Sequence, residues 1–250
     1  MEFRLKSPFR NPKPSSLPKG DRLYAIGDIH GRFDLFEALL AKIEADNAKR
    51  SNASTTIILL GDLIDRGSDS AKVVDHARCW DGSFADMVVL LGNHEASLLA
   101  VLEGKTDWME SWLGYGGRET LISYGVSPEL LALGDITEIA EAARSHVPDG
   151  HRDWFKDRPL FLQRGDFVFA HAGIRPGIAI ADQKVKDLLW IRSEFLDSEE
   201  DHGAIIVHGH SISPQPEDRH NRIGIDTGAY FSDTLTALGL EGSARWFIQS

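Results

Sequence analysis

The sequence predicts an α/β fold, and two observations carry this prediction. Three short apolar runs, at residues 23–26, 55–60 and 87–91, are separated by segments whose apolar residues recur at helical spacing. This alternation favours βαβ units with a parallel sheet. Each run also stops at a glycine that precedes a potential metal ligand. Because sites in open α/β sheets assemble outside the carboxyl ends of the strands, we expect these loops to share one crevice.

Length and composition define a broad class. The 250 residues can form one domain with a large core, and the net charge of −11 comes without a long basic block. Nucleic acid and anionic membranes are therefore not expected as partners. Cys79 is the only cysteine and no apolar stretch is long enough to span a bilayer, so we expect a cytoplasmic protein. Residues 1–20 hold four prolines among Lys, Arg and Ser, which predicts an extended leader before a single domain at 21–250.

The first apolar run is predicted to be a buried strand that ends at Gly27. Asp28 and His30 follow it, and side chains two residues apart in an extended segment point the same way. A carboxylate and an imidazole would then converge on one point. This pair alone is more typical of a turn that caps the next helix, which we expect from Leu35 to about Asn47.

The next two runs repeat this arrangement. The strand at 55–60 ends just before Asp62, and the strand at 87–91 ends just before Asn93. A helix at 69–80 is expected between them. Residues 95–158 are mostly helical in pattern, which predicts a helical cap inserted beside the site. Four of its aromatic residues could line a binding wall, although their spacing is more typical of a core: Trp108, Trp112, Tyr115 and Tyr124.

The later part of the chain supplies two more strand ends. A strand at 166–170 precedes His171, and a strand at 204–207 precedes both His208 and His210. The remaining predicted elements are a strand at 161–163, a short helix at 188–196, and antiparallel strands at 222–225, 235–240 and 244–248 that could form a second sheet.

The five strand ends deliver a set of candidate metal ligands. Carboxylate, imidazole and amide groups without thiolate suit Mn, Fe or Zn. Six ligands are too many for one catalytic metal that keeps open positions, but they suit two metals bridged by a carboxylate. Asp62, in the middle of the set, is the best candidate for the bridge. The set comprises Asp28, His30, Asp62, Asn93, His171 and either His208 or His210.

Several motifs in order carry a resemblance to a known family. GDIHG at 27–31, GDLIDRG at 61–67, GNHE at 92–95 and HAG at 171–173 resemble the phosphoprotein phosphatase family of the calcineurin-like metallophosphoesterases, and HGHS at 208–211 resembles its late histidine motif. The stretches YGGRETLISYG, LLWIRSEF and IDTGAY look like the bacterial and phage-type members. The resemblance runs from about residue 23 onward and implies a β-sandwich of two mixed sheets flanked by helices.

The resemblance also implies a ligand role for each motif residue. It implies two divalent metals, for which we expect manganese, with Fe and Zn compatible with the same ligands. His210 is preferred to His208 because the family's ligand directly follows glycine in this motif. The implied arrangement is Asp28 and His30 on one metal, Asp62 as the bridge, and Asn93, His171 and His210 on the other.

Four further residues match the family's catalytic and phosphate-binding positions. His94 resembles the general acid that protonates the leaving oxygen, and Asp65 the carboxylate that orients it. Arg66 and Arg192 resemble arginines that hold the substrate phosphate, since a planar guanidinium matches two phosphate oxygens. For Arg192 a structural salt bridge remains the alternative.

These roles predict a metal-dependent Ser/Thr-type protein phosphatase that acts on a phosphorylated protein or a small phosphate ester. A hydroxide bridging the two metals would attack phosphorus in line. The enzymatic alternative is a symmetrical bis(5′-nucleosyl)-tetraphosphatase. The first motif of that enzyme usually carries glutamine at the position of His30, so His30 favours the phosphatase. A catalytically silent binding module that retains the scaffold is the alternative from another class.

Overall fold

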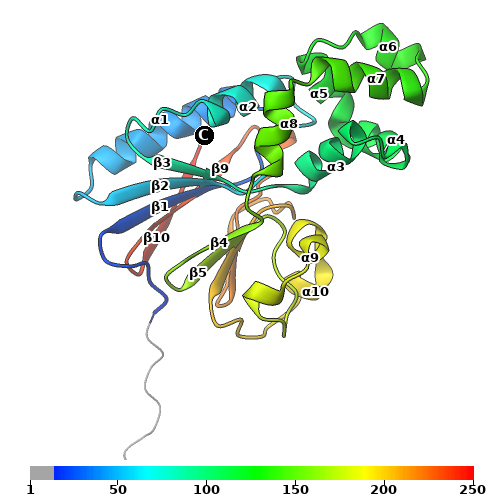
Figure 1. Ribbon diagram of the computed structural model, residues 1–250. Coiled ribbons are helices and arrows are strands. Elements are labelled where there is room, and N and C mark those ends of the chain that lie inside the picture. The colour runs from blue at the N-terminus through cyan, green and yellow to red at the C-terminus, as the bar shows by residue number, and fades with distance from the viewer. Residues whose placement is uncertain (1–13) are drawn as a thin grey trace, which may run out of the picture.

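Two five-stranded sheets pack face to face in this computed structural model, which describes residues 14–250 (Figure 1). The first sheet has the order β10-β9-β1-β2-β3 and contains β1 (Asp21–Ile26), β2 (Ser54–Leu59), β3 (Asp86–Val89), β9 (Thr236–Glu241) and β10 (Ala244–Gln249). The second has the order β4-β5-β6-β8-β7 and contains β4 (Phe161–Arg164), β5 (Phe167–Ala170), β6 (Ile205–His208), β7 (Glu217–Asp218) and β8 (Arg222–Gly224).

Both sheets are mixed, as the resemblance implied. In the first, β1, β2 and β3 run parallel, while β9 pairs antiparallel with β1 and β10. In the second, β5, β6 and β8 run parallel, and β4 and β7 are antiparallel edge strands. The predicted α/β class with two mixed sheets is therefore confirmed.

Helices cover the outer face of each sheet (Figure 1). The first sheet carries α1 (Phe33–Ala48) and α2 (Ser70–Arg78), and the second carries α9 (Val185–Trp190) and α10 (Ser193–Leu196). Between β3 and β4 the chain is helical, at the place of the predicted cap. These helices are α3 (Asn93–Leu102), η1 (Thr106–Trp108), α4 (Met109–Trp112), η2 (Leu113–Gly117), α5 (Arg118–Ser123), α6 (Pro128–Leu133), α7 (Ile136–His146) and α8 (Asp149–Lys156).

The central strands are largely apolar because both of their faces are buried. Along β1, Leu23 and Ala25 pack between the two sheets, whereas Tyr24 and Ile26 pack against the helices. The residues of β5 divide in the same way between the core of the sandwich and the core under α9 and α10. Side chains that alternate between two buried faces thus explain why these strands look like continuous apolar runs.

The expectation of a separate C-terminal sheet is wrong. β8 pairs parallel with β6, while β9 inserts beside β1 in the first sheet and β10 follows it. An apolar run shows that a strand is buried, but it does not specify the partner strand, because main-chain hydrogen bonds are the same for any sequence. β9 gains from this position because Ala237, Leu238 and Leu240 are all buried in it.

Two predicted segments differ in detail. The expected helix at 188–196 is two short helices, α9 and α10, which are separated at Ile191 and Arg192. Of the expected leader, residues 1–13 lie outside the described part of the chain. Residues 14–20 form no helix or strand but do pack on the sandwich, since Leu17 is buried and its backbone N–H donates to Gly242.

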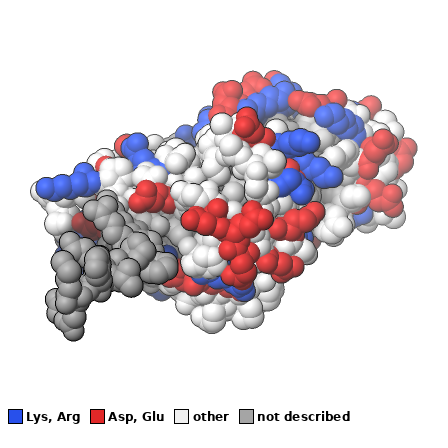
Figure 2. All heavy atoms as spheres, turned by 90° about the horizontal axis from the view of Figure 1, so that it is seen from below, with Lys and Arg blue, Asp and Glu red and all other residues white. Residues whose placement is uncertain are grey.

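Across residues 14–250, no helix is both long and apolar enough to cross a membrane. On the face shown in Figure 2, acidic side chains form a broad central area and basic side chains gather above its right-hand part.

Candidate metal centre and active site

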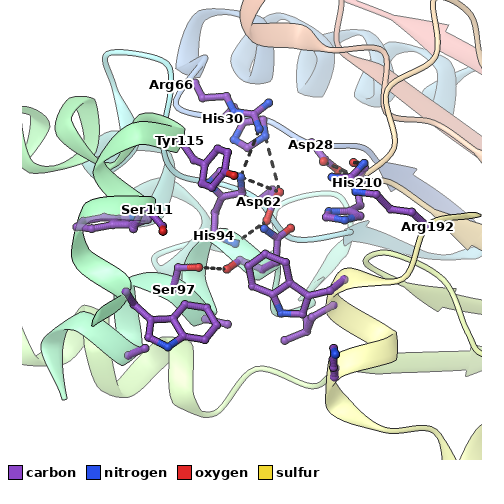
Figure 3. A pocket seen from close by; sticks show the side chains of 18 of the residues that line it. Asp28, His30, Asp62, Arg66, His94, Ser97, Ser111, Tyr115, Arg192 and His210 are labelled. Carbon is purple, nitrogen blue, oxygen red and sulfur yellow. Dashed lines mark hydrogen bonds and ion pairs between the residues drawn. The ribbon is translucent and has the colours of Figure 1, made fainter. Parts of the chain in front are cut away.

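The strand ends of both sheets meet at one cavity of about 1240 Å³ (Figure 3). The loops after β1, β2 and β3 reach it from the first sheet, and the loops after β6 and β8 reach it from the second. His171 lies directly behind the wall, with its Nε2 atom 2.8 Å from Oδ1 of Asn93. The other predicted site residues line the cavity: Asp28, His30, Asp62, Arg66, Asn93, His94, Arg192 and His210. Asp65 lies behind His94, to which it is hydrogen-bonded.

Asp62 belongs to two groups of potential metal ligands. Its carboxylate and ring nitrogens of His30 and His94 lie within 4.8 Å of one another, and so do its carboxylate and ring nitrogens of His171 and His210. All five residues are buried. Burial raises the pKa of Asp62, but the facing rings, that of His171 first, outweigh burial and hold the pKa below its usual range. This shared position is the one expected of a bridging carboxylate.

The histidine rings are oriented by backbone carbonyls. Nδ1 of His30 lies 2.8 Å from the carbonyl of Ile64, and Nδ1 of His171 lies 3.0 Å from that of Leu60. A carbonyl can only accept, so each Nδ1 must donate, and each neutral ring keeps the lone pair of Nε2 for the cavity side. Burial lowers the pKa of His30 to about 3, which keeps this ring neutral at pH 7.

Asp28 lies beside His210 rather than in either ligand group. Its carboxylate accepts a hydrogen bond from the backbone N–H of His210, with Oδ2 at 3.0 Å. Burial raises the pKa of Asp28 well above its usual range, and the neighbouring carboxylates of Asp226 and Asp62 raise it further. Three buried carboxylates therefore face one another at this wall.

The structure separates the two late histidines. His210 faces the cavity, where its ring lies 5.1 Å from that of His171 and its buried Nε2 atom has no hydrogen-bond partner. His208 lies in β6 and packs against Phe195, with its Nε2 atom 3.2 Å from the guanidinium of Arg222. Only His210 is thus oriented to hold a metal.

A buried glutamate fixes the loop that carries Asp62. The carboxylate of Glu95 accepts backbone N–H groups of Asp62, Leu63, Ile64 and Gly92 at 2.8 to 3.2 Å. A Cβ atom at Gly92 would collide with Asp62, so glycine is required for this close approach. The sequence analysis missed this role of Glu95, although its place in GNHE is the available signal.

His94 is held by a buried carboxylate. Its Nδ1 atom lies 2.6 Å from Oδ2 of Asp65, and Asp65 also accepts from Trp112 Nε1 at 2.8 Å and Thr120 Oγ1 at 2.6 Å. Burial lowers the pKa of His94, but Asp62 and Asp65 outweigh burial and raise it to about 9. Nε2 of His94 lies on the Asp62 side, 3.7 Å from Oδ2. A protonated His94 would therefore present a proton at the ligand groups.

Two arginines face the same region (Figure 3). The guanidinium of Arg66 lies 4.3 Å from the ring centroid of Tyr230, and that ring also contacts the ring of His30 at 5.5 Å. Nη1 of Arg192 lies 3.4 Å from the carbonyl of His210, and no carboxylate is recorded as its partner. The salt bridge considered for Arg192 is therefore not seen in residues 14–250.

The cap supplies an aromatic wall. Trp108 and Tyr115 line the cavity and expose 43% and 67% of their surfaces, respectively. Trp112 also lines the cavity but is buried, and its indole N–H donates a hydrogen bond to Asp65. Tyr124 lies elsewhere and bonds His151. Three of the four aromatic residues thus belong to a binding wall, which spacing alone did not indicate.

The residues of this site fit two divalent cations. The lone pairs of His171 Nε2 and Asn93 Oδ1 face each other, and His210 Nε2 is buried without a partner. Buried acceptors that face each other, together with three mutually repelling carboxylates, are the arrangement that bound cations stabilise. The donor set of carboxylates, neutral imidazoles and an amide oxygen suits Mn, Fe or Zn.

Asp226 and Tyr230 were also missed by the sequence analysis. Both line the cavity, and both belong to the IDTGAY stretch. The resemblance of this stretch to bacterial relatives was one signal for both, and for Asp226 a second signal was its position directly after the strand expected at 222–225.

The family model described as calcineurin-like phosphoesterase matches residues 21–235. The chain belongs to this family. This calcineurin-like phosphoesterase is a hydrolase whose family typically binds divalent metals.

Similar sequences carry a more specific name. This phosphoesterase is 36% identical to the symmetrical bis(5′-nucleosyl)-tetraphosphatase of Hamiltonella defensa over 155 residues, which are 61% of this chain and 44% of that protein. It thus matches less than half of that relative's length. It is 27% identical to the asymmetrical bis(5′-nucleosyl)-tetraphosphatase PrpE of Bacillus velezensis over 232 residues, which are 84% of this chain and 86% of that protein.

Solved structures show the same fold. A protein provisionally named a diadenosine tetraphosphatase aligns with a TM-score of 0.63 and 18% identity, over 92% of this phosphoesterase and 94% of that chain. A protein serine/threonine phosphatase of Saccharomyces cerevisiae aligns with a TM-score of 0.55 and 15% identity, over 92% and 79%.

Proposed function

We propose that this phosphoesterase hydrolyses a phosphoanhydride bond of dinucleoside tetraphosphates. The observation that carries the proposal is the cavity of about 1240 Å³, whose wall combines phosphate-handling groups with exposed aromatic rings. Sites for drug-sized ligands typically occupy about 300–1,000 Å³. A substrate with two nucleobases joined by a polyphosphate chain would use both the volume and the two kinds of surface. The names of the similar tetraphosphatases support the same substrate class.

This proposal revises the expectation of a Ser/Thr protein phosphatase. That expectation came from the ordered motifs, and only its preference over the tetraphosphatase depended on His30 in the first motif. Similarity over 155 and 232 residues to tetraphosphatases is the stronger guide, whereas the likeness to the yeast phosphatase, at 15% identity, concerns the fold alone. Protein phosphatase activity is the competing hypothesis, and a substrate panel distinguishes the two.

In the proposed reaction, Asp28 and His30 would hold one cation, Asn93, His171 and His210 would hold the other, and His94 would stay free of both. Bound there, the two cations would supply Lewis-acid chemistry that activates water and draws charge from phosphoryl oxygens. Asp62 would serve both cations, because its two carboxylate oxygens face the two ligand groups.

Other side chains would act on the substrate directly. Arg66 and Arg192 face the cavity and would hold phosphoryl oxygens, which gain negative charge in the transition state. His94, protonated while its pKa stays near 9, would donate its Nε2 proton to the leaving oxygen. Asp65 would keep the ring in this tautomer, since its carboxylate can only accept from Nδ1.

A substrate panel tests the proposal. With Mn²⁺ present, we expect kcat/KM for diadenosine tetraphosphate to exceed that for a phosphoserine peptide and for p-nitrophenyl phosphate by at least about tenfold, a difference of about 1.4 kcal/mol in transition-state stabilisation. Product analysis would separate symmetrical cleavage, which gives two molecules of ADP, from asymmetrical cleavage, which gives ATP and AMP. A faster reaction with the phosphopeptide would overturn the proposal in favour of the protein phosphatase. Failure to hydrolyse any of these substrates would instead favour the silent binding module.

A further inference from the structure

Trp108 and Trp190 form an aromatic pair that the reaction at the metal ligands does not use. Trp108 ends η1 in the cap, and Trp190 ends α9, which packs on the second sheet. Their ring centroids lie 6.0 Å apart with an interplanar angle of 59°. Both rings line the cavity. The pair therefore joins the cap to the opposite wall.

One ring of this pair contacts a candidate metal ligand. The ring of Trp190 contacts the ring of His210, with centroids 6.4 Å apart at 84°. His210, Trp190 and Trp108 thus form a continuous run from a candidate ligand outward. On the other flank, the ring of Tyr230 contacts His30, which belongs to the other ligand group. Aromatic surface is accordingly available on both sides of the site.

The outer end of this run is exposed. Trp108 exposes 43% of its surface, while Trp190 is half-buried beneath it. The two rings are already at contact distance, so a planar base would stack on the exposed face of Trp108 and not between the rings. Lys105, which precedes η1, lines the same cavity, so a cation is also available for the phosphates next to such a base.

We propose that Trp108, supported by Trp190, is a stacking subsite for one nucleobase of a dinucleoside polyphosphate. The inference rests on the proposed function and deepens it, because it names the residue that recognises the part of the substrate beyond the phosphates. Every base presents a π face, so this subsite would favour a base at that end without selecting which base it is.

The experiment compares two substrates that share a tetraphosphate chain, only one of which carries nucleosides. For the wild type and variants, kcat/KM is measured for diadenosine tetraphosphate and for inorganic tetraphosphate. In Trp108→Leu, the ratio of the two values should fall roughly tenfold, within the range that loss of one base–aromatic stack produces. Most of the change should lie in KM, because the base is bound equally in ground state and transition state.

Matched variants separate stacking from structure. Trp108→Phe keeps an aromatic face and should retain most of the wild-type ratio. Trp108→Gln places a polar side chain at an exposed position and should lower the ratio as much as Trp108→Leu does. Phe247→Leu removes a comparably exposed ring, on β10 and outside the cavity lining, and should leave the ratio at the wild-type value. Thermal melts of each variant would establish that it is folded.

The outcomes distinguish the two proposals. If the wild type prefers diadenosine tetraphosphate but Trp108→Leu and Trp108→Gln keep its ratio, the subsite is overturned and the proposed function stands. If the wild type hydrolyses p-nitrophenyl phosphate yet shows no preference for diadenosine tetraphosphate over inorganic tetraphosphate, the proposed function and the subsite are both overturned.

Discussion

Nδ1 of His94 and the Oδ2 atom of Asp65 are 2.6 Å apart in a buried contact. Trp112 and Thr120 from the cap donate to the same carboxylate. The proposed general acid is therefore fixed by the cap as well as by the loop after β2. This links the helical insertion to proton transfer and not only to substrate binding.

Asp65→Asn should move the alkaline limb of the pH profile of kcat/KM to lower pH. The Asp65 charge helps to raise the pKa of His94 to about 9, and the active, protonated form is lost as pH rises through that pKa. Removing one neighbouring charge should shift the limb down by roughly one unit or more. Thr120→Val, which removes a hydrogen bond but leaves the Asp65 charge in place, should shift it less. An unchanged limb in Asp65→Asn would argue against His94 as the group that titrates.

His94→Asn should reduce kcat according to the leaving group. An alkyl phosphate expels a poor leaving group and needs the proton, so we expect a loss of roughly 10²–10⁴. An aryl phosphate such as p-nitrophenyl phosphate should lose much less, with the metal content retained. Steady-state kinetics on both substrates, with metal analysis of the variant, provides the test, and equal losses would contradict the acid role.

Asp62→Asn should lower the metal content of the purified protein. The carboxylate faces both ligand groups, so an amide in its place weakens both cation sites together. Elemental analysis after gel filtration measures the loss. Full occupancy in this variant would mean that Asp62 is not the bridge.

His210→Gln and His208→Gln form a matched pair. The first removes a ring nitrogen that faces the cavity without a partner, so it should reduce metal content and activity. The second replaces a ring packed against Phe195 and Arg222, so it should lower the melting temperature while the metal remains bound. The reverse pattern of metal content would assign the ligand to His208.

Removal of metal should destabilise the fold. A ligand present at about 100 times its Kd raises the free energy of unfolding by about 2.7 kcal/mol. Each kcal/mol of that free energy shifts Tm by roughly 2–4 °C in a chain of this size. We therefore expect chelation to lower Tm by roughly 5–10 °C, and Mn²⁺ to restore it. Differential scanning calorimetry with and without chelator measures the shift, and an unchanged Tm would count against resident cations.

His30 should contribute to a loss of stability of the metal-free protein in acid. Burial lowers the pKa of His30 from 6.5 to about 3, so between these values the unfolded chain binds a proton that the folded chain does not. This contribution to stability should fall as pH drops from about 6.5 toward 3. Burial raises the pKa of Glu95 to about 8 and that of Asp226 to about 6, which acts in the opposite direction, so the test compares the wild type with His30→Gln. Between pH 7 and pH 5, the urea midpoint of His30→Gln should fall less, or rise more, than that of the wild type.

Local features of the chain were predictable from sequence. The alternation of apolar runs with helical segments predicted β1, β2 and β3, and the glycine at the end of each run located Asp28, Asp62 and Asn93 at one edge of the sheet. This worked because a strand buried on both faces is apolar along its whole length, and only its end can carry a charged group.

Long-range features were not predictable in the same way. The insertion of β9 beside β1 depends on main-chain pairing, which no side-chain pattern encodes. The position of Asp226 beside Asp28 depends in turn on the path of the chain from β8. Trp108 and Tyr115 have the spacing of core aromatics, and only the packing of the cap leaves them exposed at the cavity.

The loop conformations around the site have a consequence for protein engineering. Among the described residues, five that line the site or support it adopt positive φ values without being glycine: His30, Asp62, Asp65, Arg66 and His210. Such a conformation costs on the order of 1 kcal/mol for most side chains. Glycine would relieve this strain, but it would remove a proposed functional group at each position and, at Asp65, the acceptor of buried hydrogen bonds from His94, Trp112 and Thr120. A stabilising design for this protein would therefore leave these five positions unchanged and accept their backbone strain as a condition of turnover.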